Sequence, residues 1–114
     1  MNAPRERLAV VLLTFNSTAV IARTLAAARR VAEHVICIDS HSTDGTPELL
    51  RRLGCEVHSR RFVNYADQRN WAIDLCDARY EWQLHLDADE VLDERTIAAI
   101  HAVLAEDPAG CGFV

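Results

Sequence analysis

The chain has 114 residues, half of them hydrophobic, which is enough for one domain with its own core and too little for two. Its formal charge of -5 comes from acidic residues interspersed with arginines, and no basic stripe follows the chain, so a nucleic acid is not expected as a partner. The four cysteines form no Cys-x-x-Cys pair, and no apolar run reaches the roughly 18 residues of a membrane-spanning helix, so we expect a reduced, cytoplasmic protein.

The first half of the chain alternates apolar strands with an amphipathic helix. Residues 8–13 form a continuous run rich in Val and Leu, which predicts a strand buried on both faces. Residues 18–30 place apolar side chains on one helical face and arginines elsewhere, which predicts an amphipathic helix. Residues 35–38 are again apolar and predict a second strand that ends at Asp39.

The second half repeats this alternation. Thr46 is expected to cap a helix at residues 47–53, which opens with Pro47 and ends at Gly54, where left-handed backbone is favoured. The remaining expected elements are a strand at 55–58, a helix at 66–76, a strand at 81–86, a helix at 93–105 and the start of a strand at 112–114. Strands that alternate with helices indicate an α/β fold, with a mostly parallel sheet flanked by helices.

Every unusual polar cluster follows directly after a predicted strand. The clusters are TFNS after the first strand, DSHSTDG after the second and DADE after the strand at 81–86. Each cluster alone has an alternative interpretation as a solvated loop. Because ligands bind outside the carboxyl ends of parallel strands, three clusters at one edge of the sheet predict a binding site there.

The segment LHLDADEVL ends a predicted buried strand with Asp87 and Asp89. Two carboxylates this close repel each other unless a cation neutralises them, so the pair predicts Mg²⁺ or Mn²⁺, which would also neutralise a diphosphate. An EF-hand loop is excluded because Leu92 and Ala98 stand where Gly and Glu are required. Two alternatives stay open: exposed carboxylates beside a helix capped by Asp93, and the nucleophile motif of haloacid-dehalogenase-type phosphohydrolases, which normally lies on an opening strand.

The other two clusters offer polar groups of different kinds. Asp39, at the end of a strand, can accept hydrogen bonds from a ribose or from a base N–H, and the alternative is a simple turn. In FVNYADQRNWAID, Arg69 lies near the N-terminal end of a predicted helix, where its guanidinium can bind phosphate. Arg69 could instead pair with Asp67 or Asp74 on the surface.

Together these motifs resemble the family 2 glycosyltransferases, which have the GT-A fold. The matching segments LAVVLLTFNS, VICIDSHSTDGT, YADQRNWAID and LHLDADE stand in the order that the family has, and the likeness covers residues 8–114. The FVNYADQRNWAID segment is most similar to bacterial enzymes that add a sugar, often glucose, to the lipopolysaccharide core or other envelope glycans. The resemblance implies one Rossmann-like GT-A domain at residues 1–114 that forms only the donor-binding N-terminal half of the enzyme.

The resemblance also implies a nucleotide-sugar donor, with a UDP-sugar as the first expectation. The residues expected to bind it are Thr14, Phe15, Asn16, Asp39, Gln68, Arg69, Asn70 and Asp87. Thr14 and Asn16 would line the base pocket, and Asp39 would bind the uracil or ribose. Asp89 would bind the Mg²⁺ or Mn²⁺ that holds the diphosphate, with Asp87 beside it on the ribose or sugar side.

Other parts of such an enzyme are expected beyond Val114. In the inverting mechanism usual for the family, the acceptor pocket and the carboxylate that deprotonates the acceptor lie in the second half of the domain, so these 114 residues alone are expected to transfer little sugar. The acceptor would be a glycan or lipid-linked molecule at the cytoplasmic face of the inner membrane, with which the protein would associate peripherally. Glu90 receives no catalytic role, and a nucleotide-binding module without catalysis is the main alternative.

Overall fold

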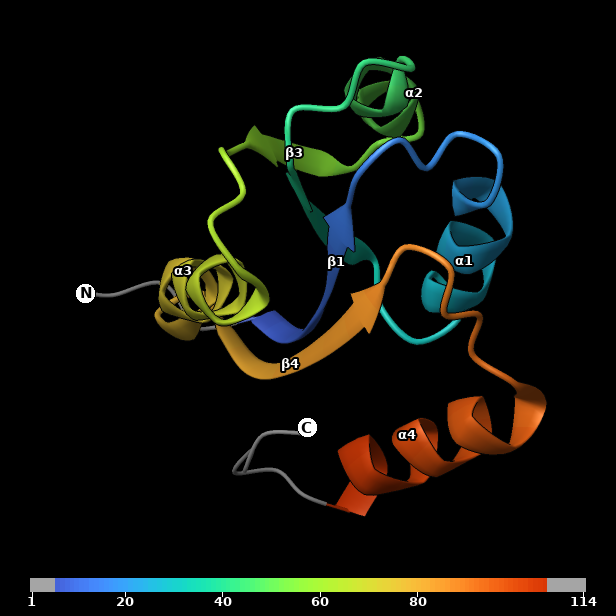
Figure 1. Cartoon of the computed structure of the whole chain (residues 1–114). Coiled ribbons are helices and arrows are strands. Elements are labelled where there is room, and N and C mark those ends of the chain that lie inside the picture. The colour runs from blue at the N-terminus through green and yellow to red at the C-terminus, as the bar shows by residue number, and fades with distance from the viewer. Residues whose placement is uncertain (1–5, 107–114) are drawn as a thin grey trace.

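The computed structural model describes residues 6–106, in which strands and helices alternate as predicted (Figure 1). The strands are β1 (Glu6–Thr14), β2 (His34–Asp39), β3 (Glu56–Ser59) and β4 (Tyr80–Asp87). The helices are α1 (Ile21–Ala28), α2 (Thr46–Arg52), α3 (Tyr65–Asp77) and α4 (Glu94–Glu106). None of the helices in this range is long and apolar enough to cross a membrane. The strand expected at residues 112–114 lies outside the described residues.

The four strands form one parallel sheet in the order β3-β2-β1-β4. The chain runs outward from β1 through β2 to β3 and then returns to the other side of β1 to form β4. The strand order therefore reverses between β1 and β4, and a crevice is expected there, outside the carboxyl ends of the strands. The register places Asp39 beside Thr14 and Asp87 beside Leu13, so three strands end at one edge of the sheet.

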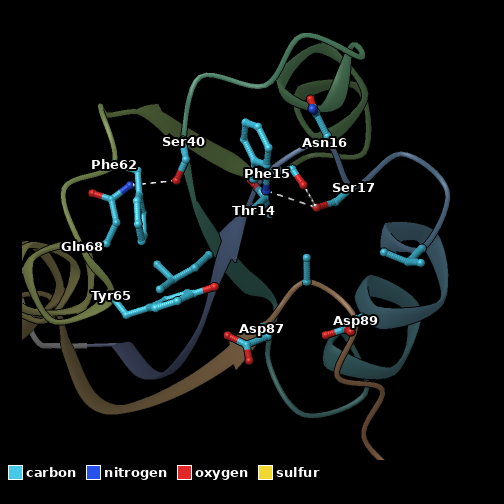
Figure 2. A pocket seen from close by; sticks show the side chains of 13 residues that line it. Thr14, Phe15, Asn16, Ser17, Ser40, Phe62, Tyr65, Gln68, Asp87 and Asp89 are labelled. Atoms are coloured by element: carbon cyan, nitrogen blue, oxygen red, sulfur yellow. Dashed lines mark hydrogen bonds between the residues drawn. The ribbon is translucent and has the colours of Figure 1, made fainter.

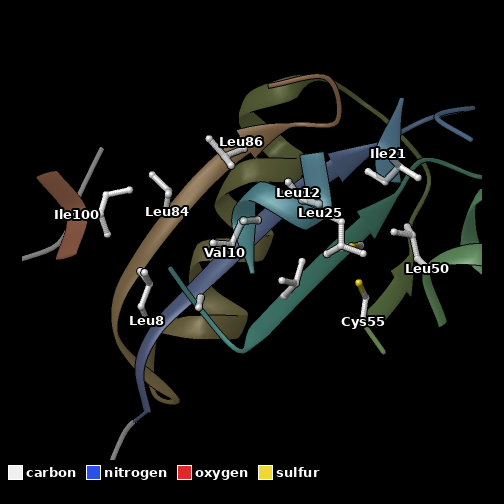
Figure 3. Packing of buried hydrophobic residues seen from close by; sticks show 14 of the residues in the cluster. Leu8, Val10, Leu12, Ile21, Leu25, Leu50, Cys55, Leu84, Leu86 and Ile100 are labelled. Carbon is white, nitrogen blue, oxygen red and sulfur yellow. The ribbon is translucent and has the colours of Figure 1, made fainter. Parts of the chain in front are cut away.

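Helices cover both faces of the sheet (Figure 1). On one face, Leu8, Val10 and Leu12 of β1 belong to a cluster that includes side chains of α1, α2 and α4, as Figure 3 shows in part. On the other face, Ala9 and Val11 pack with side chains of α3. Because residues 8–12 of β1 are buried on both faces of the sheet, the run from Leu8 to Leu13 is continuously apolar rather than alternating. This packing fixes the points at which the polar loops leave the sheet.

The start of α2 differs from the expectation. The prediction that Thr46 caps this helix is wrong, because Gly45 precedes the helix with a φ of 87° and Thr46 is the first helical residue. The backbone N–H of Thr46 donates to Asp44 Oδ1 at 3.0 Å, and Thr46 Oγ1 accepts from the backbone N–H of Ser17 at 2.8 Å. The left-handed glycine predicted after this helix is confirmed, since Gly54 has a φ of 83°.

Helix α1 begins at Ile21 rather than at residue 18. The backbone N–H groups of Val20 and Ile21 both donate to the carbonyl oxygen of Ser17, at 3.0 and 2.9 Å, so the chain makes a turn before the helix starts. This turn brings Val20 to the wall of the cavity described below.

Candidate functional site

A cavity of about 640 Å³ lies at the carboxyl edge of the sheet, where the strand order reverses between β1 and β4 (Figure 2). Its walls come from the loop after β1, from Ser40 after β2, from the segment at the start of α3 and from the turn after β4. The predicted ligand-binding residues that line it are Thr14, Phe15, Asn16, Gln68, Asp87 and Asp89. Lining residues that the sequence did not single out include Leu13, Ser17, Val20, Ser40, Phe62, Tyr65 and Ala88.

Asp39 lies behind the wall of this cavity rather than in it. Its side chain is fully buried, and its carboxylate accepts hydrogen bonds from Thr14 Oγ1 at 2.8 Å, from the Ser42 backbone N–H at 2.8 Å and from Ser42 Oγ at 2.6 Å. These bonds compensate the carboxylate for the water it loses on burial. The structure therefore gives Asp39 a role in holding the end of β1 to the end of β2 and to the loop that follows β2. Its direct contact with a uracil or ribose stays a prediction.

The loops after β1 and β2 are joined by two hydrogen bonds of Asn16. The backbone N–H of Asn16 donates to Ser42 Oγ at 2.7 Å, and the backbone N–H of Thr43 donates to Asn16 Oδ1 at 2.8 Å. Asn16 has a φ of 45°, a left-handed conformation that asparagine adopts more readily than most residues. The side chain of Asn16 thus holds the neighbouring loop while it lines the cavity.

Asp44 connects the same two loops further along the chain. Its carboxylate accepts hydrogen bonds from the backbone N–H and Oγ1 of Thr46 and from the backbone N–H and Oγ1 of Thr18. Hydrogen bonds from Thr46 and then from Thr18 lower the pKa of the Asp44 carboxyl to about 2. The ionised carboxylate therefore connects the segment before α1 with the start of α2.

Gln68 is buried and uses its polar atoms within the protein. Its Nε2 donates to Ser40 Oγ and to the carbonyl oxygen of Arg60, both at 3.2 Å, and its Oε1 accepts from Arg60 Nη1 at 2.8 Å. Gln68 therefore orients Ser40 in the wall of the cavity, as Figure 2 shows. Its predicted contact with a nucleotide stays a prediction.

The structure does not bring Arg69 and Asn70 to the cavity. Both are exposed on α3. Burial and, less strongly, the positive charge of Arg69 lower the pKa of the His85 imidazole to about 4, which places Arg69 near β4. Asp67 pairs with Arg60, and within residues 6–106 Arg69 forms no ion pair with Asp67 or Asp74. The predicted roles of Arg69 and Asn70 beside a nucleotide stay predictions.

Asp87 and Asp89 place two exposed carboxylates at the cavity, on the side of β4 (Figure 2). Within residues 6–106, neither carboxylate accepts a hydrogen bond or forms an ion pair. Carboxylate oxygens are the ligands that hard cations prefer, so this donor set fits Mg²⁺ or Mn²⁺. The same range contains no group of three or more His, Cys, Asp or Glu side chains able to hold a metal, so oxygens of a bound ligand or of water would complete the coordination.

The alternatives for this segment have different outcomes. Asp93 Oδ1 accepts from the backbone N–H of Thr96 at 2.7 Å, so the prediction that Asp93 caps the following helix is confirmed. A phosphohydrolase nucleophile would lie on an opening strand, whereas Asp87 ends β4, the last strand of the described sheet. The position of Asp87 therefore disfavours the phosphohydrolase alternative.

Aromatic side chains form a wall of the cavity that the sequence revealed only in part. Phe15 was predicted, while Phe62 and Tyr65 were not, and the exposed fractions of the three are 60%, 42% and 67%. The rings of Phe62 and Tyr65 contact each other edge to face, with centroids 5.1 Å apart. Exposed rings beside a cavity offer a stacking surface for a planar group such as a nucleobase. The sequence feature that indicates this wall is the pair of aromatic residues on either side of Asn64. Asn64 caps α3, since its side chain accepts a hydrogen bond from the backbone N–H of Asp67.

Sequence comparisons find relatives of this chain among glycosyltransferases. The chain is 32% identical over 100 residues to an uncharacterized glycosyltransferase of Rickettsia felis, an alignment that covers 88% of this chain and 35% of the relative. It is 31% identical over 107 residues to the lipopolysaccharide core biosynthesis glycosyltransferase LpsC of Rhizobium meliloti, covering 90% of this chain and 38% of that protein. The chain thus spans little more than a third of the length of these curated relatives.

A solved structure shows the same fold. The crystal structure of S. aureus TarS superposes with a TM-score of 0.67 and 21% sequence identity, over 88% of this chain and 20% of that chain. This likeness agrees with the expected α/β fold of the GT-A type. The sequence profile named glycosyl transferase family 2 matches residues 9–113, almost the whole chain. With this match and the similarity to the relatives above, the chain belongs to glycosyl transferase family 2.

Proposed function

We propose that this chain binds a nucleotide-diphosphate sugar, with a UDP-sugar as the first candidate, and supplies the donor and metal site for sugar transfer. The observation that carries the proposal is the cavity at the reversal point of the sheet, which is lined by exposed aromatic rings and by two carboxylates that have no partner in residues 6–106. A nucleotide-sugar has a planar base at one end and a diphosphate in its middle. The base matches the aromatic rings, and the diphosphate with its cation matches the carboxylates.

The two ends of the cavity suggest an orientation for the donor. The base would stack on Phe15 in the loop after β1 or on Phe62 and Tyr65 in the segment at the start of α3, and the diphosphate would face Asp87 and Asp89. Two carboxylates repel a diphosphate, so a divalent cation between them is required for binding. When bound, Mg²⁺ or Mn²⁺ would stabilise the charge that grows on the leaving nucleoside diphosphate.

The proposed acceptor is a glycan or a lipid-linked molecule of the bacterial envelope. The name of LpsC, which places that relative in lipopolysaccharide core biosynthesis, supports this class of acceptor. Because a lipid-linked acceptor would lie at a membrane, we further propose peripheral association with the cytoplasmic face of the inner membrane. No residue in 6–106 is assigned as the base that deprotonates the acceptor.

The donor site can be tested by calorimetric titration of UDP and UDP-glucose with and without Mn²⁺. We expect binding that depends on Mn²⁺ and that weakens by at least about tenfold in Asp89→Ala, because a metal ligand is lost. Asp74→Asn is a matched control, since Asp74 is exposed on α3 outside the cavity. Metal-independent binding would contradict the role of the carboxylates, and the absence of any UDP binding would contradict the proposal as a whole.

A further inference from the structure

The turn that carries Asp87 and Asp89 is held by residues that do not line the cavity. The backbone N–H of Glu90 donates to the carbonyl oxygen of Asp87 at 3.0 Å, and Glu90 Oε1 accepts from the backbone N–H of Asp87 at 2.8 Å. Glu90 therefore closes the turn twice, once with its backbone and once with its side chain. Both bonds use backbone groups of Asp87 and leave its carboxylate free.

A second support comes from helix α1. Thr24 is fully buried there, and its Oγ1 donates to the carbonyl oxygen of Ala88 at 2.6 Å, across 64 positions of sequence. The same hydroxyl is 3.4 Å from the carbonyl oxygen of Val20, a longer and weaker contact. Because a hydroxyl has one hydrogen to donate, the short bond to Ala88 is the one that Thr24 makes. Helix α1 thus fixes the residue between the two aspartates.

The supports and the carboxylates have separate tasks. The hydrogen bonds from Thr24 and to Glu90 involve only backbone atoms of Asp87 and Ala88, while the carboxylates of Asp87 and Asp89 have no partner in residues 6–106. Glu90 does not join the two aspartates in a three-ligand cluster within this range. A fixed backbone with free side chains is preorganised for a ligand, because less conformational freedom is lost on binding.

We propose that Thr24 and Glu90 are positioning residues, which hold the Asp87–Asp89 turn in the geometry that binds the cation and the diphosphate. This inference rests on the proposed donor site. Glu90 acts through an accepted hydrogen bond and not through its charge, and Thr24 acts through its hydroxyl. Two conservative variants follow from this chemistry: Glu90→Gln keeps an acceptor oxygen without the charge, and Thr24→Ser keeps the hydroxyl.

The test compares these conservative variants with variants that lose the hydrogen bond. We expect Mn²⁺-dependent UDP binding to weaken about tenfold in Glu90→Ala and in Thr24→Val, and to stay within about twofold of the wild type in Glu90→Gln and Thr24→Ser. Glu48→Ala removes the same charge from an exposed position on α2 and serves as the control. If Glu90→Gln binds as weakly as Glu90→Ala, Glu90 acts through its charge and the inference is overturned.

A second measurement needs no ligand and follows the turn itself. Hydrogen exchange of the Asp87 amide in the unliganded protein should speed up about tenfold in Glu90→Ala, because that amide loses its acceptor, and should be unaffected in Glu48→Ala. Unchanged exchange in Glu90→Ala would overturn the positioning role even if UDP binding weakened. Wild-type protein that binds no UDP with Mn²⁺ would instead overturn the proposed donor site, while the exchange measurement would still decide whether Glu90 holds the turn.

Discussion

The two sides of the cavity use their polar groups in opposite ways. On the side of β1 and β2, Asp39 and Asp44 each accept several hydrogen bonds from the protein, and Asn16 joins the two loops. On the side of β4, the carboxylates of Asp87 and Asp89 accept none from the described residues. The four aspartates thus divide into two that hold the loops behind the cavity and two that are left for a ligand.

This difference teaches that an aspartate at the end of a strand is not by itself a ligand-binding group. A buried carboxylate must find donors within the protein, and once it has them it contributes to stability more than to binding. An exposed carboxylate without donors contributes little to stability and keeps its capacity for a cation. The two sides should therefore respond differently to the same kind of substitution, and three variants test this from the largest expected effect to the smallest.

The largest effect is expected for Asp39→Ala. This change leaves the buried Thr14 Oγ1 and the part-buried backbone N–H of Ser42 without their acceptor, so the free energy of unfolding should fall by roughly 2 to 4 kcal/mol. Urea denaturation followed by circular dichroism measures the loss. Asp39→Asn keeps one acceptor oxygen and should lose less, and Asp74→Asn should lie within about 0.5 kcal/mol of the wild type. A loss below about 1 kcal/mol in Asp39→Ala would show that these hydrogen bonds do not hold the end of β1 to the end of β2.

The sequence does not reveal that Asp39 stabilises the fold rather than facing the cavity. Its place at the end of a strand was predicted from the apolar run before it, and the fold follows from such runs because burial on both faces of a sheet demands them. The donors of Asp39, however, come from Thr14 on another strand and from Ser42 in a loop whose path depends on left-handed residues. Contacts of this kind depend on tertiary placement, which periodicity does not encode.

Side-chain direction limited the prediction of the site in the same way. The sequence placed the segment of Gln68, Arg69 and Asn70 at the start of a helix, but one residue of rotation decides which of them meets the cavity. Gln68 faces inward, while Arg69 and Asn70 face solvent. Phe62 precedes the helix in a loop, where no periodicity indicates direction. Residues on strand ends, such as Asp87, were easier to place because parallel strands share one carboxyl edge.

A smaller effect, which depends on pH, is expected for Asp44→Asn. Because the folded-state pKa of Asp44 is about 2, below its ordinary value of 3.8, its hydrogen bonds stabilise the fold above pH 4 and are lost as the pH falls toward 2. Asp44→Asn should therefore be less stable than the wild type at pH 6, and the difference should shrink between pH 4 and pH 2. Since Asp44 is exposed, solvent screening keeps the effect modest.

Urea midpoints of wild type and Asp44→Asn at pH 6, 4 and 2.5 measure this change. The control is Asp74→Asn, whose carboxylate has no hydrogen-bond partner in residues 6–106. A stability gap between wild type and Asp44→Asn that is the same at all three pH values would mean that Asp44 acts through shape and not through its ionised form. Of Asp39 and Asp44, only Asp39 would then support the comparison between the two sides of the cavity.

The smallest effect on stability, and the sharpest test of the comparison, is expected for the double variant Asp87→Asn, Asp89→Asn. Neither carboxylate has a partner to lose within residues 6–106, and removing two neighbouring negative charges relieves repulsion, so the free energy of unfolding should stay within about 0.5 kcal/mol or rise slightly. Mn²⁺-dependent UDP binding should nevertheless be lost in calorimetry, because amides are poor substitutes for carboxylates around a hard cation. A fall in stability comparable to that of Asp39→Ala would place all four aspartates in one structural network. Binding lost at constant stability would instead show that the two carboxylates serve a ligand, because the turn after β4 is held by Thr24 and Glu90 through backbone atoms of Asp87 and Ala88.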